Sequence, residues 1–162
     1  HRMDKSKVAA TIAESADRTI MFTRTKAMAD RLAGDLKDLG INAAPIHGDL
    51  RQTSREKSLR DFSEGKLNTL VATDVAARGI HVDEVDVVIQ YDPPGDHKTY
   101  LHRAGRTARA GEKGLVVTLS MWDEELEIKR LQKRIDVIMP IVEMFSNDVR
   151  LKNLAEWDPE SA

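Results

Sequence analysis

The chain has no cysteine among its 162 residues, which excludes a disulfide framework and any metal site built on thiolates. It also lacks a long apolar run. The longest one toward the C-terminus, residues 137–142, contains Pro140 and is far too short to span a bilayer. The first residues have no apolar core of the kind found in a signal peptide. We therefore expect a cytoplasmic protein that does not contact a membrane.

An excess of charge of one sign is missing as well. The formal net charge is −2, and 41% hydrophobic with 32% charged residues is an ordinary composition for a folded globular domain. A chain with this charge has no overall attraction for polyanions, so any contact with nucleic acid must come from a local basic cluster. Residues 98–113 form such a cluster, because they hold five Lys or Arg and one Glu.

Short apolar runs alternate with helical patterns along the chain. Strands are expected at 19–23, 41–46, 68–73, 85–91 and 114–120, and helices at 25–40, 52–65, 97–109 and 123–136. Asp96 is a candidate N-cap for the third helix, and Ser120 with Asp123 is a candidate capping pair for the last. The strands are continuous runs of Val, Ile and Leu, which is typical of a buried parallel sheet.

This alternation predicts an α/β fold, a parallel sheet with helices on both faces in a three-layer sandwich, over residues 1–138. Residues 139–162 mix apolar and charged groups without a clean period. They are expected to form a packed extension, the start of a linker, or a tail that docks a partner.

Polar motifs follow three of the expected strands, where parallel sheets bind their ligands. The motifs are FTRTK at 22–26, IHGDLRQTSR at 46–55 and ATDVAARG at 72–79. Hydroxyls, cations and glycines at strand ends suit contact with a sugar-phosphate backbone. Each motif is also compatible with a plain helix start or a surface ion pair, so none of them decides the function alone.

The segment HRAGRTARAG at 102–111 is more informative. Arg103, Arg106 and Arg109 recur at every third position, with no Asp or Glu between them. Like charges at helical spacing cost roughly 0.2–0.5 kcal/mol per pair, so a fold gains nothing from this cluster. Guanidinium groups bind phosphate oxygens two at a time. We therefore expect the three arginines to form one solvent-facing row of donors that meets a triphosphate.

Taken in this order, the four segments resemble the C-terminal RecA-like lobe of DEAD-box ATP-dependent RNA helicases. The resemblance covers residues 5–138: FTRTK resembles motif IV, 52–55 the family's Q-x-x-R, ATDVAARG motif V, and 102–109 the H-R-x-G-R-x-x-R of motif VI. It implies a RecA-like sheet and an RNA helicase that hydrolyses ATP in its full-length form. Two alternatives stay open, a DNA helicase or translocase lobe and a stand-alone, catalytically silent RNA-binding module.

The resemblance also implies roles for individual residues. Arg106 and Arg109 would be arginine fingers at the γ-phosphate of ATP, and His102 would link the ATP and RNA sites. RNA would be held by its phosphates and sugars, independent of sequence, through Thr25, Gly48, Arg55, Thr73 and Gly79. The groups near ATP would be Gly79, His81, Asp83, Arg106 and Arg109. The family usually has Asp where His81 stands, so binding of the ribose through a carboxylate is in question here.

A complete ATPase of this type also needs a phosphate-binding loop, G-x-x-x-x-G-K-[ST]. No such loop is present, because the nearest candidate, Gly65-Lys66, is followed by Leu67. Residues 83–86 read DEVD but precede an expected strand, whereas carboxylates that hold Mg²⁺ in this architecture follow one. We therefore predict no metal on this chain. ATP and Mg²⁺ would be held mainly by an N-terminal RecA-like lobe of the same full-length protein, and the isolated lobe would be a monomer without ATPase activity.

Overall fold

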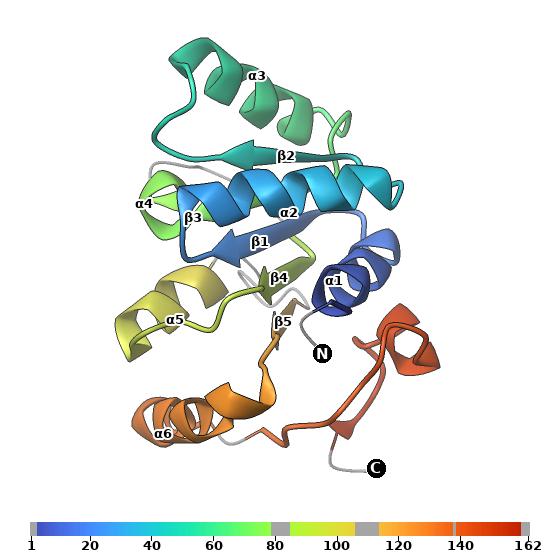
Figure 1. The fold of residues 1–162 in the computed structure, drawn as a ribbon, viewed down its shortest axis with the longest axis vertical. Coiled ribbons are helices and arrows are strands. Elements are labelled where there is room, and N and C mark those ends of the chain that lie inside the picture. The colour runs from blue at the N-terminus through green and yellow to red at the C-terminus, as the bar shows by residue number, and fades with distance from the viewer. Residues whose placement is uncertain (1–2, 79–84, 106–113, 138, 160–162) are drawn as a thin grey trace.

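The computed structural model describes residues 3–78, 85–105, 114–137 and 139–159. At its centre lies a sheet of five parallel strands in the order β2-β3-β1-β4-β5 (Figure 1). The strands are β1 Thr19–Thr23, β2 Ala43–Ile46, β3 Thr69–Thr73, β4 Val87–Gln90 and β5 Leu115–Thr118. Each of them lies within a segment that the sequence predicts as a strand.

The described helices are α1 Lys5–Glu14, α2 Lys26–Asp38, α3 Gln52–Ser63, α4 Asp74–Ala77, α5 His97–Ala104 and α6 Glu125–Ile135, with 3₁₀ turns η2 Trp122–Glu124 and η3 Val149–Lys152. The sequence patterns missed α1. Within the predicted helix 97–109, α5 covers His97–Ala104 with Gly105 as its C-cap, and residues 106–109 lie outside the described part of the chain. None of the helices in the described part of the chain is both long and apolar enough to cross a membrane.

Helix caps explain where two of these helices begin. The expected cap Asp96 is confirmed, since its side chain accepts a hydrogen bond of 2.7 Å from the backbone N–H of Thr99. The expected pair of Ser120 with Asp123 is wrong. Glu124 takes that role instead, and its carboxylate accepts a hydrogen bond of 2.8 Å from the N–H of Met121.

The sheet has a separate core on each face, because neighbouring residues of a strand point to opposite sides. Met21 and Val71 belong to a core that also contains buried residues of α1 and α2. Phe22 and Leu70 point the other way and pack in a second core with Phe62 of α3 and residues of α4. Helices therefore cover both faces, and the predicted three-layer α/β sandwich is confirmed.

The C-terminal segment returns to the first helix. Leu151 of η3 is only 3% exposed and belongs to the same core as α1 and α2. The backbone N–H of Ser146 donates a hydrogen bond of 2.7 Å to the carboxylate of Asp4, the residue just before α1. Figure 1 shows this segment running from α6 back toward α1. Residues beyond 139 thus share part of their packing with the sheet domain.

This packing predicts a specific loss of stability. Replacing Leu151 by Ala should lower the free energy of unfolding by about 2–5 kcal/mol, because a buried Leu leaves a cavity that the surroundings fill only in part. Denaturant unfolding monitored by circular dichroism measures the change. Val149, two residues away and 78% exposed, provides the matched control, and Val149→Ala should leave the stability nearly unchanged. Equal stability of both variants would show that the segment does not pack on α1 in solution.

Candidate functional site

The three motif-bearing loops meet at one edge of the sheet. Thr23 at the end of β1 pairs in register with Thr73 at the end of β3, and Ile46 at the end of β2 pairs with Ala72. β3 lies between β2 and β1, so Thr25 and Gly48, which follow β1 and β2, and Thr73, which ends β3, lie at the same edge of the sheet. In Figure 1 the arrows of β1 and β2 point toward this edge. The sequence motifs therefore form a common surface, which their separation along the chain does not show.

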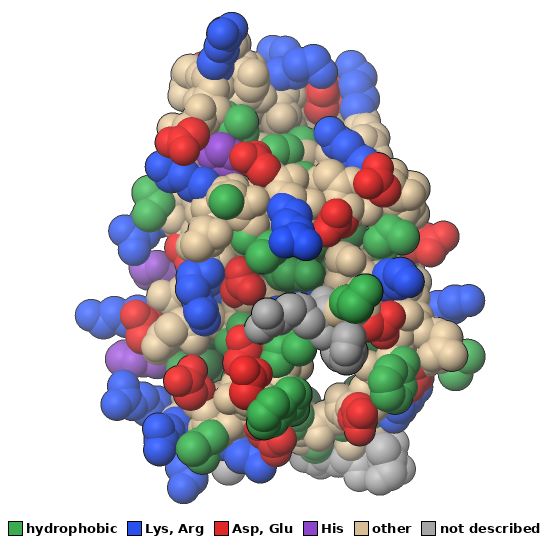
Figure 2. Space-filling view, in the orientation of Figure 1, with side chains coloured by type: hydrophobic (Ala, Val, Ile, Leu, Met, Phe, Trp, Pro, Cys, Tyr) green, Lys and Arg blue, Asp and Glu red, His purple; other side chains and the backbone are tan. Residues whose placement is uncertain are grey.

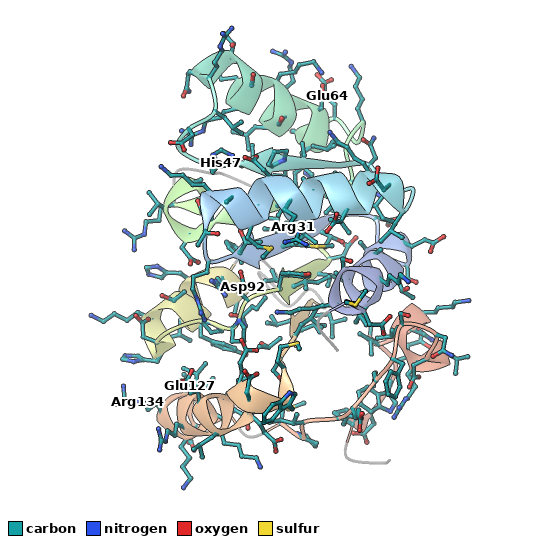
Figure 3. All side chains as sticks on the ribbon, in the orientation of Figure 1. Arg31, His47, Glu64, Asp92, Glu127 and Arg134 are labelled. Atoms are coloured by element: carbon teal, nitrogen blue, oxygen red, sulfur yellow. The ribbon has the colours of Figure 1, made fainter. Side chains whose placement is uncertain are left out.

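A buried histidine ties the β2 loop to helix α2. His47 is 3% exposed, and its Nε2 lies 2.7 Å from the Asp30 carboxylate on α2 (Figure 3). Its Nδ1 accepts a hydrogen bond of 3.2 Å from the backbone N–H of Asp49. Because Nδ1 accepts, the proton must reside on Nε2 and be donated to Asp30. The histidine thereby fixes the backbone on both sides of Gly48.

Lys26 crosses from the start of α2 to the same loop. Its ammonium group lies 2.9 Å from the Asp49 carboxylate, and this hydrogen bond and charge lower the pKa of Asp49 below its usual value. Thr25, just before it, caps α2 by accepting a hydrogen bond of 3.1 Å from the N–H of Met28. The Thr25 hydroxyl proton takes no part in this cap, so the hydroxyl can still donate to a ligand.

Arg55 and Thr73 have side-chain polar groups without a hydrogen-bond partner among the described residues. The buried Nε of Arg55 has no hydrogen-bond acceptor, and no ion pair to this arginine occurs among the described residues. The alternative in which Arg55 pairs with a surface carboxylate is therefore not supported. Thr73 is 8% exposed and stands before α4 without a side-chain cap to that helix.

Arg103 overturns part of the sequence prediction. It was expected in a solvent-facing row with Arg106 and Arg109, but it is 2% exposed. Its Nε lies 2.7 Å and its Nη2 2.9 Å from the two carboxylate oxygens of Asp74, the first residue of α4. The reason is the direction of α5, which turns this side chain toward the sheet, where its guanidinium lies over the ring of Phe22, 5.3 Å from the centroid. The row of three free arginines is wrong for its first member.

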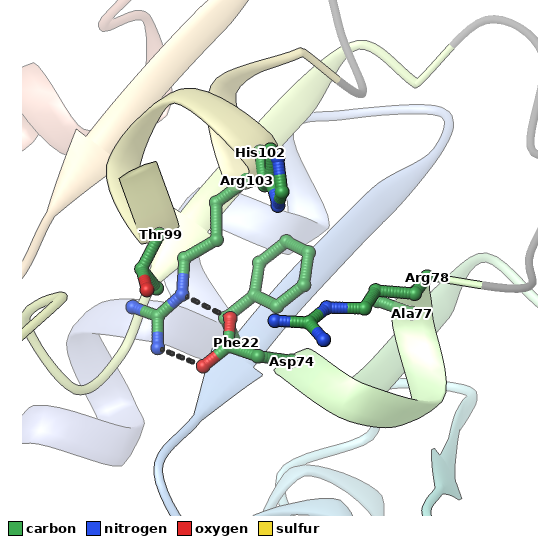
Figure 4. Close-up of a pocket in the computed structure, with 7 residues that line it drawn as sticks. All are labelled: Phe22, Asp74, Ala77, Arg78, Thr99, His102 and Arg103. Carbon is green, nitrogen blue, oxygen red and sulfur yellow. Dashed lines mark hydrogen bonds and ion pairs between the residues drawn. The ribbon is translucent and has the colours of Figure 1, made fainter. Parts of the chain in front are cut away.

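A small pocket lies beside this ion pair, between α4 and α5 (Figure 4). Its lining residues are Phe22, Asp74, Ala77, Arg78, Thr99, His102 and Arg103. Arg78 and His102 are both exposed, and they bring basic groups from motif V and motif VI to one place. The segments at 72–79 and 102–111, which were assigned to one function from sequence alone, thus touch each other in the fold.

The remaining expectations concern residues outside the described part of the chain. These are Gly79, His81, Asp83, Arg106 and Arg109. The sequence patterns in turn missed two pairs that the structure contains, Asp74 with Arg103 and Asp30 with His47. The position of Asp74 directly after a strand was the one available signal for the first pair, and nothing in the sequence indicated the second.

Acidic residues near the sheet have structural partners. Asp86, the last residue of DEVD, accepts hydrogen bonds of 3.0 and 2.9 Å from the backbone N–H groups of Asp17 and Arg18. Within the described ranges, no group of three or more His, Asp or Glu side chains has a geometry that fits a metal ion.

Comparison with known proteins decides the family. Residues 4–111, more than half of the chain, match the model of the helicase conserved C-terminal domain. This chain belongs to that family. It is 49% identical over 121 residues to the ATP-dependent rRNA helicase RRP3 of Yarrowia lipolytica, a match that covers 72% of this chain and 25% of the relative. The RRP3 protein of Saccharomyces cerevisiae is 52% identical over 111 residues, with 68% and 22% covered.

Solved structures place the chain among DEAD-box helicase domains. The S. cerevisiae Dbp5 protein bound to RNA and ADP BeF3 superposes with a TM-score of 0.83 at 30% identity, covering 96% of this chain and 42% of that one. The E. coli DEAD-box protein SrmB, bound to the regulator RraA, gives a TM-score of 0.76 at 36% identity, with 85% and 84% covered. The predicted C-terminal RecA-like lobe of DEAD-box type is confirmed. The chain spans about a quarter of the length of the curated relatives it matches.

Proposed function

We propose that this chain is the C-terminal lobe of an ATP-dependent RNA helicase, which binds the RNA backbone and completes an ATP site carried by a second lobe. The observation that carries the proposal is the shared register of β1, β2 and β3, which brings three motif loops to one edge. Relatives whose matches cover 72% and 68% of this chain are described as ATP-dependent rRNA helicases. We assign the lobe to residues 1–138 and treat 139–162 as its extension. The expected cytoplasmic location stays a prediction.

The RNA surface in this proposal is the carboxyl edge of the sheet. Thr25 supplies a hydroxyl, Gly48 lets a sugar or phosphate approach the backbone, and Arg55 supplies a guanidinium that no described carboxylate neutralises. Thr73 and Gly79 would extend the contact along motif V. Figure 2 shows Lys and Arg side chains along the left margin of the molecule, the edge toward which β1 and β2 point in Figure 1. Such contacts recognise the backbone and carry no sequence preference.

The nucleotide would reach this lobe from a partner, since the sequence lacks a phosphate-binding loop. An N-terminal RecA-like lobe of the same full-length protein would hold ATP and Mg²⁺. Arg106 and Arg109 would then contact the γ-phosphate when the two lobes meet, with Gly79 and His81 or Asp83 near the ribose. His102, exposed on α5 beside the motif V residue Arg78, would link the two sites. Dbp5, bound to RNA and ADP BeF3, is a structural relative that holds both kinds of ligand.

Salt dependence of RNA binding tests the proposal. Fluorescence anisotropy with single-stranded RNAs of two unrelated sequences should give affinities within a few-fold of each other. The logarithm of the binding constant should fall linearly with that of the salt concentration, by about 0.7 per phosphate contact. Arg55→Ala should weaken binding to both RNAs and reduce this slope by about 0.7–1.

Arg60 provides the control because it lies exposed on the same helix, and Arg60→Ala should leave the slope unchanged. A strong preference for one RNA sequence would contradict a backbone groove. DNA of the same sequence serves as a further comparison. Tighter binding to DNA than to RNA would favour the alternative of a DNA helicase lobe, and RNA binding without any ATPase partner in the full protein would favour a silent module.

A further inference from the structure

The buried guanidinium of Arg103 makes hydrogen bonds to several elements of the fold. Besides the two hydrogen bonds to Asp74, its Nη1 donates one of 2.6 Å to the backbone carbonyl of Asp92 and lies 3.5 Å from the side-chain oxygen of Gln90. The acceptors lie on β4, on the loop that follows it, and on α4 after β3, while Phe22 of β1 stacks below. One side chain thus joins the ends of three central strands.

The Asp74–Arg103 ion pair lies next to two proposed functional residues in the chain. Asp74 directly follows Thr73, a proposed RNA contact, and Arg103 directly follows His102, the proposed link to ATP. A bidentate contact between a guanidinium and a carboxylate fixes both the distance and the plane of the two groups. α4 is a four-residue helix whose first residue, Asp74, makes this contact, while Ala76 and Ala77 pack in the core. The pair therefore fixes the start of motif V, where α4 begins, against the last turn of α5.

A gain in folding stability does not explain why the Asp74–Arg103 ion pair is buried. Burying an ion pair removes both charges from water, and an apolar pair of similar volume is often as stable or more stable. Phe22, Ala76 and Ala77 already supply an apolar surface at this place. An apolar pair would not fix the distance and orientation of the two side chains as the bidentate contact between Arg103 and Asp74 does.

We propose that Arg103 and Asp74 form a strut that makes the RNA-contacting end of β3 and the His102 turn of α5 move as one unit. Arg103 is then a positioning residue for RNA-stimulated ATP hydrolysis, and it acts through its neighbours without touching RNA or ATP. Binding of RNA at Thr73 is passed to His102 through this strut. This inference rests on the proposed helicase function.

The test measures ATP turnover of the two-lobed protein with and without saturating RNA. Arg103→Gln and Asp74→Asn should each reduce the RNA-stimulated rate at least tenfold and change the rate without RNA by less than twofold. Because both variants break the same contact, the double variant should lose little more than either single one. Arg103→Lys, which keeps the charge but not the fork, should recover only a small part of the stimulation.

Two controls separate positioning from general stability. Glu125→Gln removes an exposed ion pair with Lys129, 2.7 Å long, and should leave the stimulation unchanged. Leu36→Ala weakens the core on the opposite face of the sheet without touching the strut, and below its melting temperature it should keep the stimulation. The assay is made at a temperature at which circular dichroism shows every variant folded. Asp74→Asn and Arg103→Lys change the side chains least.

The outcomes are distinct. If the folded strut variants keep the full RNA stimulation, the strut has no positioning role, while the helicase function stands. If Leu36→Ala loses as much stimulation as Arg103→Gln at equal foldedness, the effect is one of stability and the inference fails. If the unaltered protein shows no RNA stimulation at all, the proposed function itself fails.

Discussion

In the two-lobed protein, Arg109→Ala should reduce RNA-stimulated ATP turnover by about 10³-fold or more while changing RNA affinity only slightly. An arginine finger acts on the charge that develops during phosphoryl transfer, and such groups contribute about 10³–10⁵ in rate. The proposed RNA contacts lie on other elements, at Thr25, Gly48, Arg55 and Thr73, so binding should persist. Phosphate release and fluorescence anisotropy measure the two quantities on the same preparation.

The control for this change is Arg134→Ala. Arg134 is an exposed arginine on α6, far along the chain from the motifs, and its loss should leave turnover and RNA binding unchanged (Figure 3). Arg106→Ala should resemble Arg109→Ala in direction. A turnover number that survives Arg109→Ala would count against the finger assignment, and an equal loss of RNA affinity would assign this arginine to the RNA surface instead.

The second prediction with a large expected effect concerns ATP hydrolysis by this lobe without a partner lobe. We expect no ATP hydrolysis above the buffer rate from this lobe, with or without RNA, because the sequence has no phosphate-binding loop. A sensitive phosphate-release assay measures it. Positioning and charge stabilisation supply nearly all of the catalysis in phosphoryl transfer, and both require the nucleotide and its Mg²⁺ to be held in place.

RNA binding by the same sample provides the internal control, since it shows that the lobe is folded and competent. The two-lobed protein, assayed in parallel, should hydrolyse ATP and respond to RNA. Robust RNA-stimulated turnover by the lobe alone would contradict the proposal that ATP and Mg²⁺ are held mainly by a second lobe. It would also require a nucleotide site that the motifs of this chain do not contain.

Much of the fold was predictable because its signals are local. Short apolar runs bounded by polar turns predicted all five strands, whereas the order of the strands and their register appear only in the tertiary structure. Asp96 was predictable as a cap because a cap is set by residues three apart. α1 was missed because its apolar residues, Val8, Ala9, Ile12 and Ala13, include small alanines that give a weak period.

The site was predictable only in part. The resemblance of the motifs to those of DEAD-box helicases gave the candidate contacts Thr25, Gly48 and Thr73, and the sheet places them at one edge. The same spacing was misleading for Arg103, since a period of three predicts a shared face but not which side of the helix meets the sheet. That choice depends on Phe22, Asp74 and Asp92, which lie far from it in the chain.

The sequence by itself therefore determined the strands, the order of the motifs and the family to which they belong, because these depend on residue types and short spacings. Only the tertiary structure decided that Arg103 turns inward to Asp74, and that His47 is buried against Asp30. Both pairs join residues from different elements, and their formation depends on which strands are neighbours. A guanidinium that looks free in a linear motif becomes part of the core once a carboxylate after another strand lies within hydrogen-bond distance.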